Sequence, residues 1–403
     1  MHLRLLELEQ FRSYRGLVLP VGPAGLRLRG PNASGKSTLL EAIMMLATTR
    51  SPRSGSERET IRHGSGEDLG VPPFARVRAI VERRDGRVEI EIGLQVDARR
   101  STLARKVIRL NGRPVRSIDA VGQLKAVLFS PEDVGLVSGT PSSRRRYLDL
   151  TISQVDPAYL RALSRYGRVL EQRNSLLKAL QRDRVDPHGS SAAGQLAFWD
   201  EELLLHGCAV VSGRSRAIRR LSHLAREQYR RLSEGDLAVA YLPSVDVGQA
   251  GEQDDANPAT LLATIRRAFA HALQERRAEE VRRGVTVVGP HRDDLEFVAS
   301  GVDLGTFGSR GQQRLAVVAL KLAETVLMTE SAGEAPVLLL DDVLSELDLH
   351  HRRQLEATAA AISAQAIVTG TDASEWTGVA LDHLPAAVLR DGSIVSDGAP
   401  EIR

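Results

Sequence analysis

The chain has 403 residues, of which 42% are hydrophobic, and this is enough for two lobes with substantial cores. Its formal net charge is only +3, so overall charge does not by itself indicate a nucleic-acid binder. The single cysteine, Cys208, excludes an intrachain disulfide framework and any metal site built from several cysteines.

The amino-terminal residues read as an amphipathic strand, and no signal peptide precedes it. No run of about 18 apolar residues is found in the chain, so no membrane-spanning helix is predicted. We therefore expect a soluble protein of the cytoplasm that does not act at a membrane.

Residues 30–38 read GPNASGKST and match the phosphate-loop pattern G-x-x-x-x-G-K-[ST]. A short strand is predicted at 26–28, immediately before this loop, and a helix is predicted over 37–47 after it. A plain glycine turn before a helix is the alternative. The flanking strand and helix favour a nucleotide site, because the pattern requires that context.

Each part of this loop has a chemical role in the prediction. Gly30 and Gly35 allow the backbone to wrap a phosphate without side-chain clashes, and the helix N-terminus faces the anion. Lys36 is expected to reach the β- and γ-phosphates of ATP, and the Ser37 hydroxyl to bind Mg²⁺. The predicted nucleotide-binding residues are Gly30, Pro31, Asn32, Ala33, Ser34, Gly35, Lys36, Ser37 and Thr38.

Hairpins are predicted next, because Asp85-Gly86 and Asn111-Gly112 are turn signals between alternating runs. Residues 134–283 then change to a helical period. A loop is expected at 181–195 and a return to strand at 285–288. The predicted helices, which suggest a short antiparallel arm, cover about 160–180, 203–232 and 259–283.

The second half of the expected site lies near the other end of the chain, where residues 337–342 read VLLLDD. A continuous apolar run suits a strand buried on both faces of a mainly parallel sheet. Asp341 would lie at its carboxyl end and hold the metal, partly through water, and Asp342 would orient the attacking water or accept its proton. Such a pair can also be only a helix cap. The presence of Lys36 in the same chain favours the catalytic interpretation.

Residues 308–314 read GSRGQQR and open a predicted amphipathic helix, whose start could donate backbone N–H groups to an anion. With SELD at 345–348, the chain here resembles the ABC-type ATPase heads of the SMC-like group. That resemblance implies that Ser309 and Gly311 of one subunit complete the ATP site of a second subunit. An ordinary helix cap is the alternative.

Thr369, in IVTGTD, lies at the end of a predicted strand where many ABC ATPases place a histidine that senses the γ-phosphate. A neutral hydroxyl would form a weaker hydrogen bond, which puts fast hydrolysis in doubt.

Several motifs in the same order resemble the bacterial RecF family of recombination mediators, from about residue 3 to about 371. They are LELEQFRSYRGL, FSPED, GTPSSRRRYLD, EQRNSLL, GPHRDDL and PVLLLDDVLSELD. The family usually has threonine where this chain has Ser37. The resemblance implies an α/β fold, an ABC-type ATPase head assembled from residues 1–133 and 285–403, with a helical lobe inserted over 134–284.

The resemblance also implies a function. ATP would drive a homodimer to clamp on DNA, either duplex or a single-strand/double-strand junction. With RecO and RecR, the protein would help to load recombinase during DNA repair and replication-fork recovery, and weak, DNA-stimulated ATP hydrolysis would reset it. Two other classes compete, an ABC-transporter ATPase subunit and a small-molecule kinase. DNA stimulation of ATP hydrolysis would exclude the transporter subunit, and turnover independent of protein concentration would favour the kinase.

Arginine clusters in the helical region are plausible contacts to the DNA backbone, although any one is more often a solvated helix face. Aromatic residues make up only 4%, which favours backbone recognition over base stacking. The clusters are Arg144 to Arg146, the group of Arg214, Arg216, Arg219 and Arg220, Arg276-Arg277 and Arg282-Arg283.

Residues 291–294, HRDD, suggest either a metal site or, by the resemblance, a link between lobe position and nucleotide state. The second interpretation is favoured, because a metal site needs a compatible ligand set and spacing. Two apparent insertions, at 65–72 and 244–258, receive no predicted function.

Overall fold

The computed structural model describes residues 1–96, 104–246, 258–343, 347–371, 381, 384–390 and 392–396. Ser345 and Glu346 of the SELD motif, and most of the 244–258 insertion, lie outside these ranges. The chain divides into two compact units. The first comprises Met1–Asp133, Glu227–Glu234 and Val317–Arg403, and the second comprises Val134–Arg226 and Gly235–Ala316.

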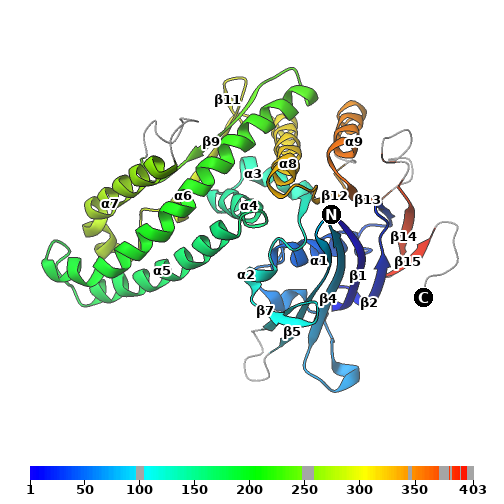
Figure 1. Ribbon diagram of the computed structural model, residues 1–403, viewed down its shortest axis with the longest axis horizontal. Coiled ribbons are helices and arrows are strands. Elements are labelled where there is room, and N and C mark those ends of the chain that lie inside the picture. Colours follow the sequence, from blue (N-terminus) through cyan, green and yellow to red (C-terminus); the bar gives the residue numbers. More distant parts are fainter. Residues whose placement is uncertain are drawn as a thin grey trace. The chain divides into compact units, whose positions relative to one another are not determined.

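A six-stranded sheet in the first unit is built from both ends of the chain, in the order β15-β14-β3-β13-β12-β8. Its strands are parallel except β15, which is antiparallel to β14. This arrangement confirms the α/β head assembled from N- and C-terminal segments (Figure 1). The strands are β3 (Gly25–Arg29), β8 (Ala126–Phe129), β12 (Val337–Asp341), β13 (Gln365–Gly370), β14 (Ala386–Arg390) and β15 (Ser393–Ser396).

A second, antiparallel sheet in this unit has the order β2-β1-β4-β5-β6-β7. The two predicted turns are confirmed, since they join β4 to β5 and β6 to β7. Helix α1 (Lys36–Thr48) is buried on nearly every side and shares one core with both sheets, as its largely apolar sequence requires. The strands are β1 (His2–Phe11), β2 (Tyr14–Pro20), β4 (Phe74–Arg83), β5 (Gly86–Val96), β6 (Ala104–Leu110) and β7 (Arg113–Val115).

Short helices and the C-terminal α9 complete the first unit, and α8 continues into it from the second unit. Three of the short helices are 3₁₀ helices, at Glu57–Thr60, Glu67–Leu69 and Pro131–Val134. The segment Glu67–Leu69 lies within the apparent insertion at 65–72. The α-helices are α2 (Ser117–Ala120), α8 (Arg310–Ala332) and α9 (Leu349–Ile362).

The second unit is mainly helical, and the three long helices predicted from leucine spacing are present (Figure 1). The loop between the first two is shorter than expected, because α6 already begins at Ser190. The unit begins at Val134, as does the expected helical lobe, but extends past residue 284 to Ala316. The helices are α3 (Gly135–Ser138), α4 (Pro141–Ser153), α5 (Pro157–Arg182), α6 (Ser190–Leu232) and α7 (Pro258–Arg283).

Two expectations for this unit are wrong. Residues 237–242, placed in the helical region by periodicity, form β9 (Leu237–Leu242), which pairs with β10 (Asp294–Ala299), and β10 pairs in turn with β11 (Val302–Asp303). Residues 285–288 form no strand. Their backbone groups bond to side chains instead: Asn174 Oδ1 accepts from the Thr286 N–H, and Glu280 Oε1 accepts from the Val287 N–H.

Helices α5 and α6 approach closely at two glycines. A Cβ atom on Gly213 would lie 2.6 Å from the Tyr159 ring, and one on Gly207 would lie 2.6 Å from the Phe269 ring and 3.1 Å from the Tyr166 ring. Both tyrosines are buried, so the absence of a side chain at these two glycines allows α5 to pack closely against its neighbours. None of the described helices is long and apolar enough to span a membrane.

Candidate active site

The carboxyl ends of three parallel strands meet at one edge of the first unit's sheet. Strand β13 lies between β3, which leads into the phosphate loop, and β12, which ends at Asp341. The register pairs Asp341 with Thr369 and Arg29 with Gly370. Open α/β sheets bind ligands at this edge.

The phosphate loop is closed around the Lys36 side chain, which is only 7% exposed. Lys36 Nζ donates to the carbonyl oxygens of Gly30 (2.6 Å) and Pro31 (3.0 Å). Gly35 has a φ of 105°, and the Tyr14 hydroxyl donates to its carbonyl oxygen at 3.0 Å. A Cβ at Gly35 would lie 2.8 Å from that hydroxyl oxygen, so both backbone conformation and space require glycine there.

The start of α1 suits an anion. It has no side-chain cap and no acidic residue in its first turn, and the N-terminus of a helix presents N–H groups that favour an anion. Within the described part of the chain, the buried Ser34 hydroxyl also has no hydrogen-bond partner. These polar groups fit a nucleotide's phosphates, the ligand that the sequence pattern predicts.

Two hydroxyls converge on one carboxylate oxygen at the sheet edge. Ser37 Oγ and Thr369 Oγ1 each donate to Asp341 Oδ1, both at 2.9 Å. Burial raises the pKa of Asp341 above its usual range, although these two hydrogen bonds oppose the shift. A hydroxyl and a carboxylate in contact are oxygen ligands of the kind Mg²⁺ takes in nucleotide sites, so the residues present fit that ion.

Asp342 follows in an unusual conformation, with a φ of 53°. Its N–H donates to Thr369 Oγ1 at 3.1 Å, so one threonine hydroxyl joins the two consecutive aspartates. The left-handed turn breaks strand alternation at this residue. Such backbone outliers persist where the surrounding structure holds them, often at functional sites.

Sequence reasoning missed several side chains near this edge. Tyr14 anchors the loop, and Arg12 bonds to the buried Glu41 of α1 at 2.7 Å. The charges of Arg53 and Glu132 also act on Asp341, in opposite directions. Glu132 lies in the FSPED motif, but only the pairing of β8 with β12 places that motif beside Asp341.

Ser309 and Gly311 belong to the second unit, whereas Lys36, Ser37, Asp341 and Thr369 belong to the first. Ser309 is exposed and caps α8 reciprocally with Gln312. The Ser309 N–H donates to Gln312 Oε1 (2.9 Å), and the Gln312 N–H donates to Ser309 Oγ (3.3 Å). The capping interpretation is therefore correct for the isolated chain, and a role towards a second subunit stays a prediction.

Two of the HRDD residues, His291 and Asp293, take part in hydrogen bonds within the second unit. Arg214, which is 2% exposed, donates to Asp149 (2.9 and 3.0 Å), to Asp293 (3.0 Å) and to the Pro290 carbonyl (2.6 Å). The neighbouring His291 contacts Tyr166 and Thr286. Among the described residues no group of three or more His, Cys, Asp or Glu side chains could hold a metal ion, so the metal interpretation of HRDD is not supported.

The same contacts correct two of the proposed DNA-binding arginines. Arg144 Nε and Nη2 donate to the two carboxylate oxygens of Asp294, at 2.6 and 2.8 Å, and its side chain is 11% exposed. Arg214 is buried among the two aspartates named above. Both arginines already neutralise carboxylates, so neither is available to a phosphate.

Comparisons with known proteins agree on one family. A family model described as "RecF/RecN/SMC N terminal domain" matches residues 2–382. The DNA replication and repair protein RecF of Chloroflexus aurantiacus is 45% identical over 400 residues, covering 98% of this chain and 99% of that protein. RecF of Thermomicrobium roseum is 45% identical over 399 residues, with the same coverages.

Solved structures agree with this result. A structure described as the recombination mediator protein RecF-ATP in the RecFOR pathway superposes with a TM-score of 0.83 at 30% identity, covering 98% of this chain and 97% of that one. An Smc head domain from Pyrococcus furiosus, bound to the C-terminal domain of ScpA, gives a TM-score of 0.53 at 18% identity and covers 98% and 96% of the two chains. That second likeness concerns the fold alone.

Proposed function

Because this chain belongs to the RecF family, we propose that it is an ATPase of DNA replication and repair. The observation that carries the proposal is the sheet edge where the phosphate loop, Asp341 and Thr369 meet. Relatives with 45% identity over nearly the whole chain are named for DNA replication and repair, and a solved relative is described with ATP.

Different residues of the chain would bind the nucleotide, bind the metal ion and activate the attacking water. Lys36 and the N–H groups at the start of α1 would hold the β- and γ-phosphates. Ser37 and Asp341 would hold Mg²⁺, which supplies positive charge against the phosphate oxygens. Asp342 would orient a water molecule for attack and accept its proton. Thr369 would fix both aspartates, and its neutral hydroxyl supports slow hydrolysis.

Ser309 and Gly311 would act on a nucleotide held by a second copy of the chain. A two-fold dimer would then bury two nucleotides, each between Lys36 of one protomer and Ser309 of the other. ATP would close this dimer on duplex DNA or a junction, and hydrolysis would release it. Cooperation with RecO and RecR in loading recombinase follows from the family and belongs to the same proposal.

Mixing two inactive variants tests this sharing of sites. Ser309→Arg should bind ATP yet fail to dimerise or hydrolyse it, because a bulky cation crowds the closing interface. Lys36→Ala should fail to bind ATP. A mixed dimer contains one site with both residues intact, so partial ATPase activity should return. Full activity of Ser309→Arg as a monomer would exclude the arrangement.

DNA binding measured with and without ATP, together with oligomeric state, tests the wider function. We expect ATP to convert monomer to dimer and to strengthen DNA binding in the same concentration range. The transporter and kinase alternatives predict no effect of duplex DNA on hydrolysis. DNA-independent turnover by a monomer would contradict the proposal.

A further inference from the structure

Helix α5 carries a row of three arginines, Arg161, Arg165 and Arg168, all of them exposed. The spacing of four and then three residues places them on one side of the helix. Among the described residues, none of the three has a salt-bridge or hydrogen-bond partner. The row is thus an uncompensated strip of positive charge within the second unit.

Three exposed arginines on α7 differ, because carboxylates neutralise them. On α7, Arg266 lies 2.5 Å from Glu201, and Arg276 and Arg283 lie 3.2 and 3.1 Å from Glu279. Arginine-rich sequence is therefore a poor guide to free positive charge here. The α5 row stands out from this pattern.

The row is also held in place. Asp156 caps the start of α5 by accepting from the N–H groups of Ala158 and Tyr159, both at 2.9 Å. Tyr159 and Tyr166, on the buried side, pack against the two glycines of α6. At a rise of about 1.5 Å per residue, Arg161 and Arg168 are about 10 Å apart along the axis. That is about three nucleotide steps of one DNA strand, at about 3.4 Å each.

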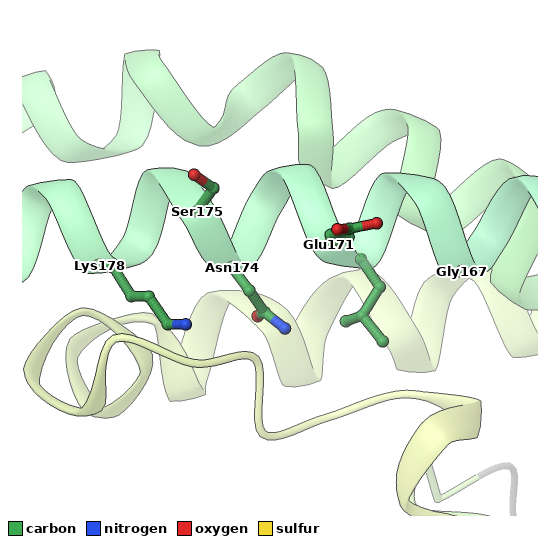
Figure 2. A pocket seen from close by; sticks show the side chains of 6 residues that line it. Gly167, Glu171, Asn174, Ser175 and Lys178 are labelled. Atoms are coloured by element: carbon green, nitrogen blue, oxygen red, sulfur yellow. The ribbon is translucent and has the colours of Figure 1, made fainter. Parts of the chain in front are cut away.

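A groove on the flank of the same helix is a weaker candidate. It is lined by Gly167, Leu170, Glu171, Asn174, Ser175 and Lys178. Figure 2 shows Lys178 and Asn174 pointing to the same side of α5. Asn174 already accepts from Thr286, and the Glu171 carboxylate offsets the Lys178 ammonium, so the groove offers no net charge to an anion.

We propose that Arg161, Arg165 and Arg168 bind phosphates along one strand of the DNA backbone. This rests on the proposed function and adds to it the surface that DNA would contact. Guanidinium groups suit phosphate because their planar N–H donors match its oxygens, and a row on a rigid helix tracks a backbone without reading sequence. Charge complementarity selects a polyanion as the partner, since the row has no apolar anchor for a protein.

The test compares two triple variants that remove the same amount of charge. The first is Arg161→Gln/Arg165→Gln/Arg168→Gln, and the matched control on α7 is Arg266→Gln/Arg276→Gln/Arg283→Gln. Glutamine keeps helix propensity in both. Duplex DNA affinity is measured with ATP over a range of salt concentrations. The wild-type log–log slope should become shallower by about 2.7 in the first variant, at about 0.9 per phosphate contact, and stay unchanged in the control.

ATP binding is measured in parallel and should be the same in all three proteins. If the wild type binds duplex DNA and the α5 variant keeps its salt slope, the row is not the contact surface, although the proposed function stands. An equal change of slope in the control would also contradict the proposal, because the loss of any three exposed arginines would then have the same effect. If the wild type binds neither duplex DNA nor a single-strand/double-strand junction, both the row and the proposed function fail.

Discussion

Lowering the pH should destabilise the second unit through His291. Its Nε2–H donates to the Thr286 carbonyl (3.0 Å), and its Nδ1 accepts from the Tyr166 hydroxyl (2.6 Å), an arrangement that requires the neutral ring. Burial, followed by the charges of Arg292, Arg145 and Arg173, lowers the pKa of His291 to about 4, although the hydrogen bond to Thr286 opposes the shift.

The sign and size of the effect follow from this pKa. The pKa of the unfolded chain's histidine is near 6.5, so the unfolded state takes up the proton first as the pH falls. The stability contributed by neutral His291 is complete above pH 6.5 and is lost as the pH falls towards 4. For these two pKa values, the free energy of unfolding should fall by about 2 kcal/mol between pH 7 and pH 5.

Urea unfolding can measure this change, because Trp199 on α6 reports on the second unit. A Trp376→Phe background removes the other tryptophan. His291→Gln supplies the control, since glutamine can donate to the Thr286 carbonyl but does not titrate. Between pH 7 and pH 5, the wild type should lose about 2 kcal/mol more than this variant. Equal losses would show that His291 is not held neutral and would refute the reasoning.

The remaining predictions concern the nucleotide site and the basic clusters. Lys36→Ala should abolish ATP binding, whereas Asp342→Asn should bind ATP and hydrolyse it slowly; equal affinities in a titration of both would contradict these separate roles. Gly35→Ala should weaken ATP binding at least tenfold with the thermal midpoint lowered only slightly, because its φ of 105° and the nearby Tyr14 strain the loop. Arg144→Glu should cost about 2–4 kcal/mol of stability, since it faces Asp294, and should leave the DNA salt slope unchanged in a binding titration.

Much of the site could be predicted from local pattern. The phosphate loop is contiguous in sequence, and its strand, glycines and helix start are encoded within about twenty residues. The apolar run before Asp341 likewise predicts a buried strand, and leucine spacing predicts the long helices α5 to α7. These features depend on backbone sterics and on burial of one face, which neighbouring residues decide.

Tertiary structure decided which of these pieces meet. Only the order of strands β3, β13 and β12 brings the Thr369 hydroxyl onto Asp341 and onto the backbone of Asp342. Residues 285–288 have a strand-like composition, but Asn174 and Glu280 take their hydrogen bonds. A segment with strand propensity does not form a strand when side chains from other helices accept the hydrogen bonds of its backbone N–H groups.

The arginines show most clearly the difference between what the sequence determines and what the tertiary structure decides. Sequence alone determined that the second unit is rich in arginine, and it predicts phosphate contacts at several clusters, including 144–146 and 214–220. The fold instead places Asp294 against Arg144, and Asp149 and Asp293 against Arg214, while the more widely spaced row on α5 stays uncompensated. Charge is a property of a residue, but its availability depends on the carboxylates that folding brings within a few ångströms, and these come from distant parts of the chain.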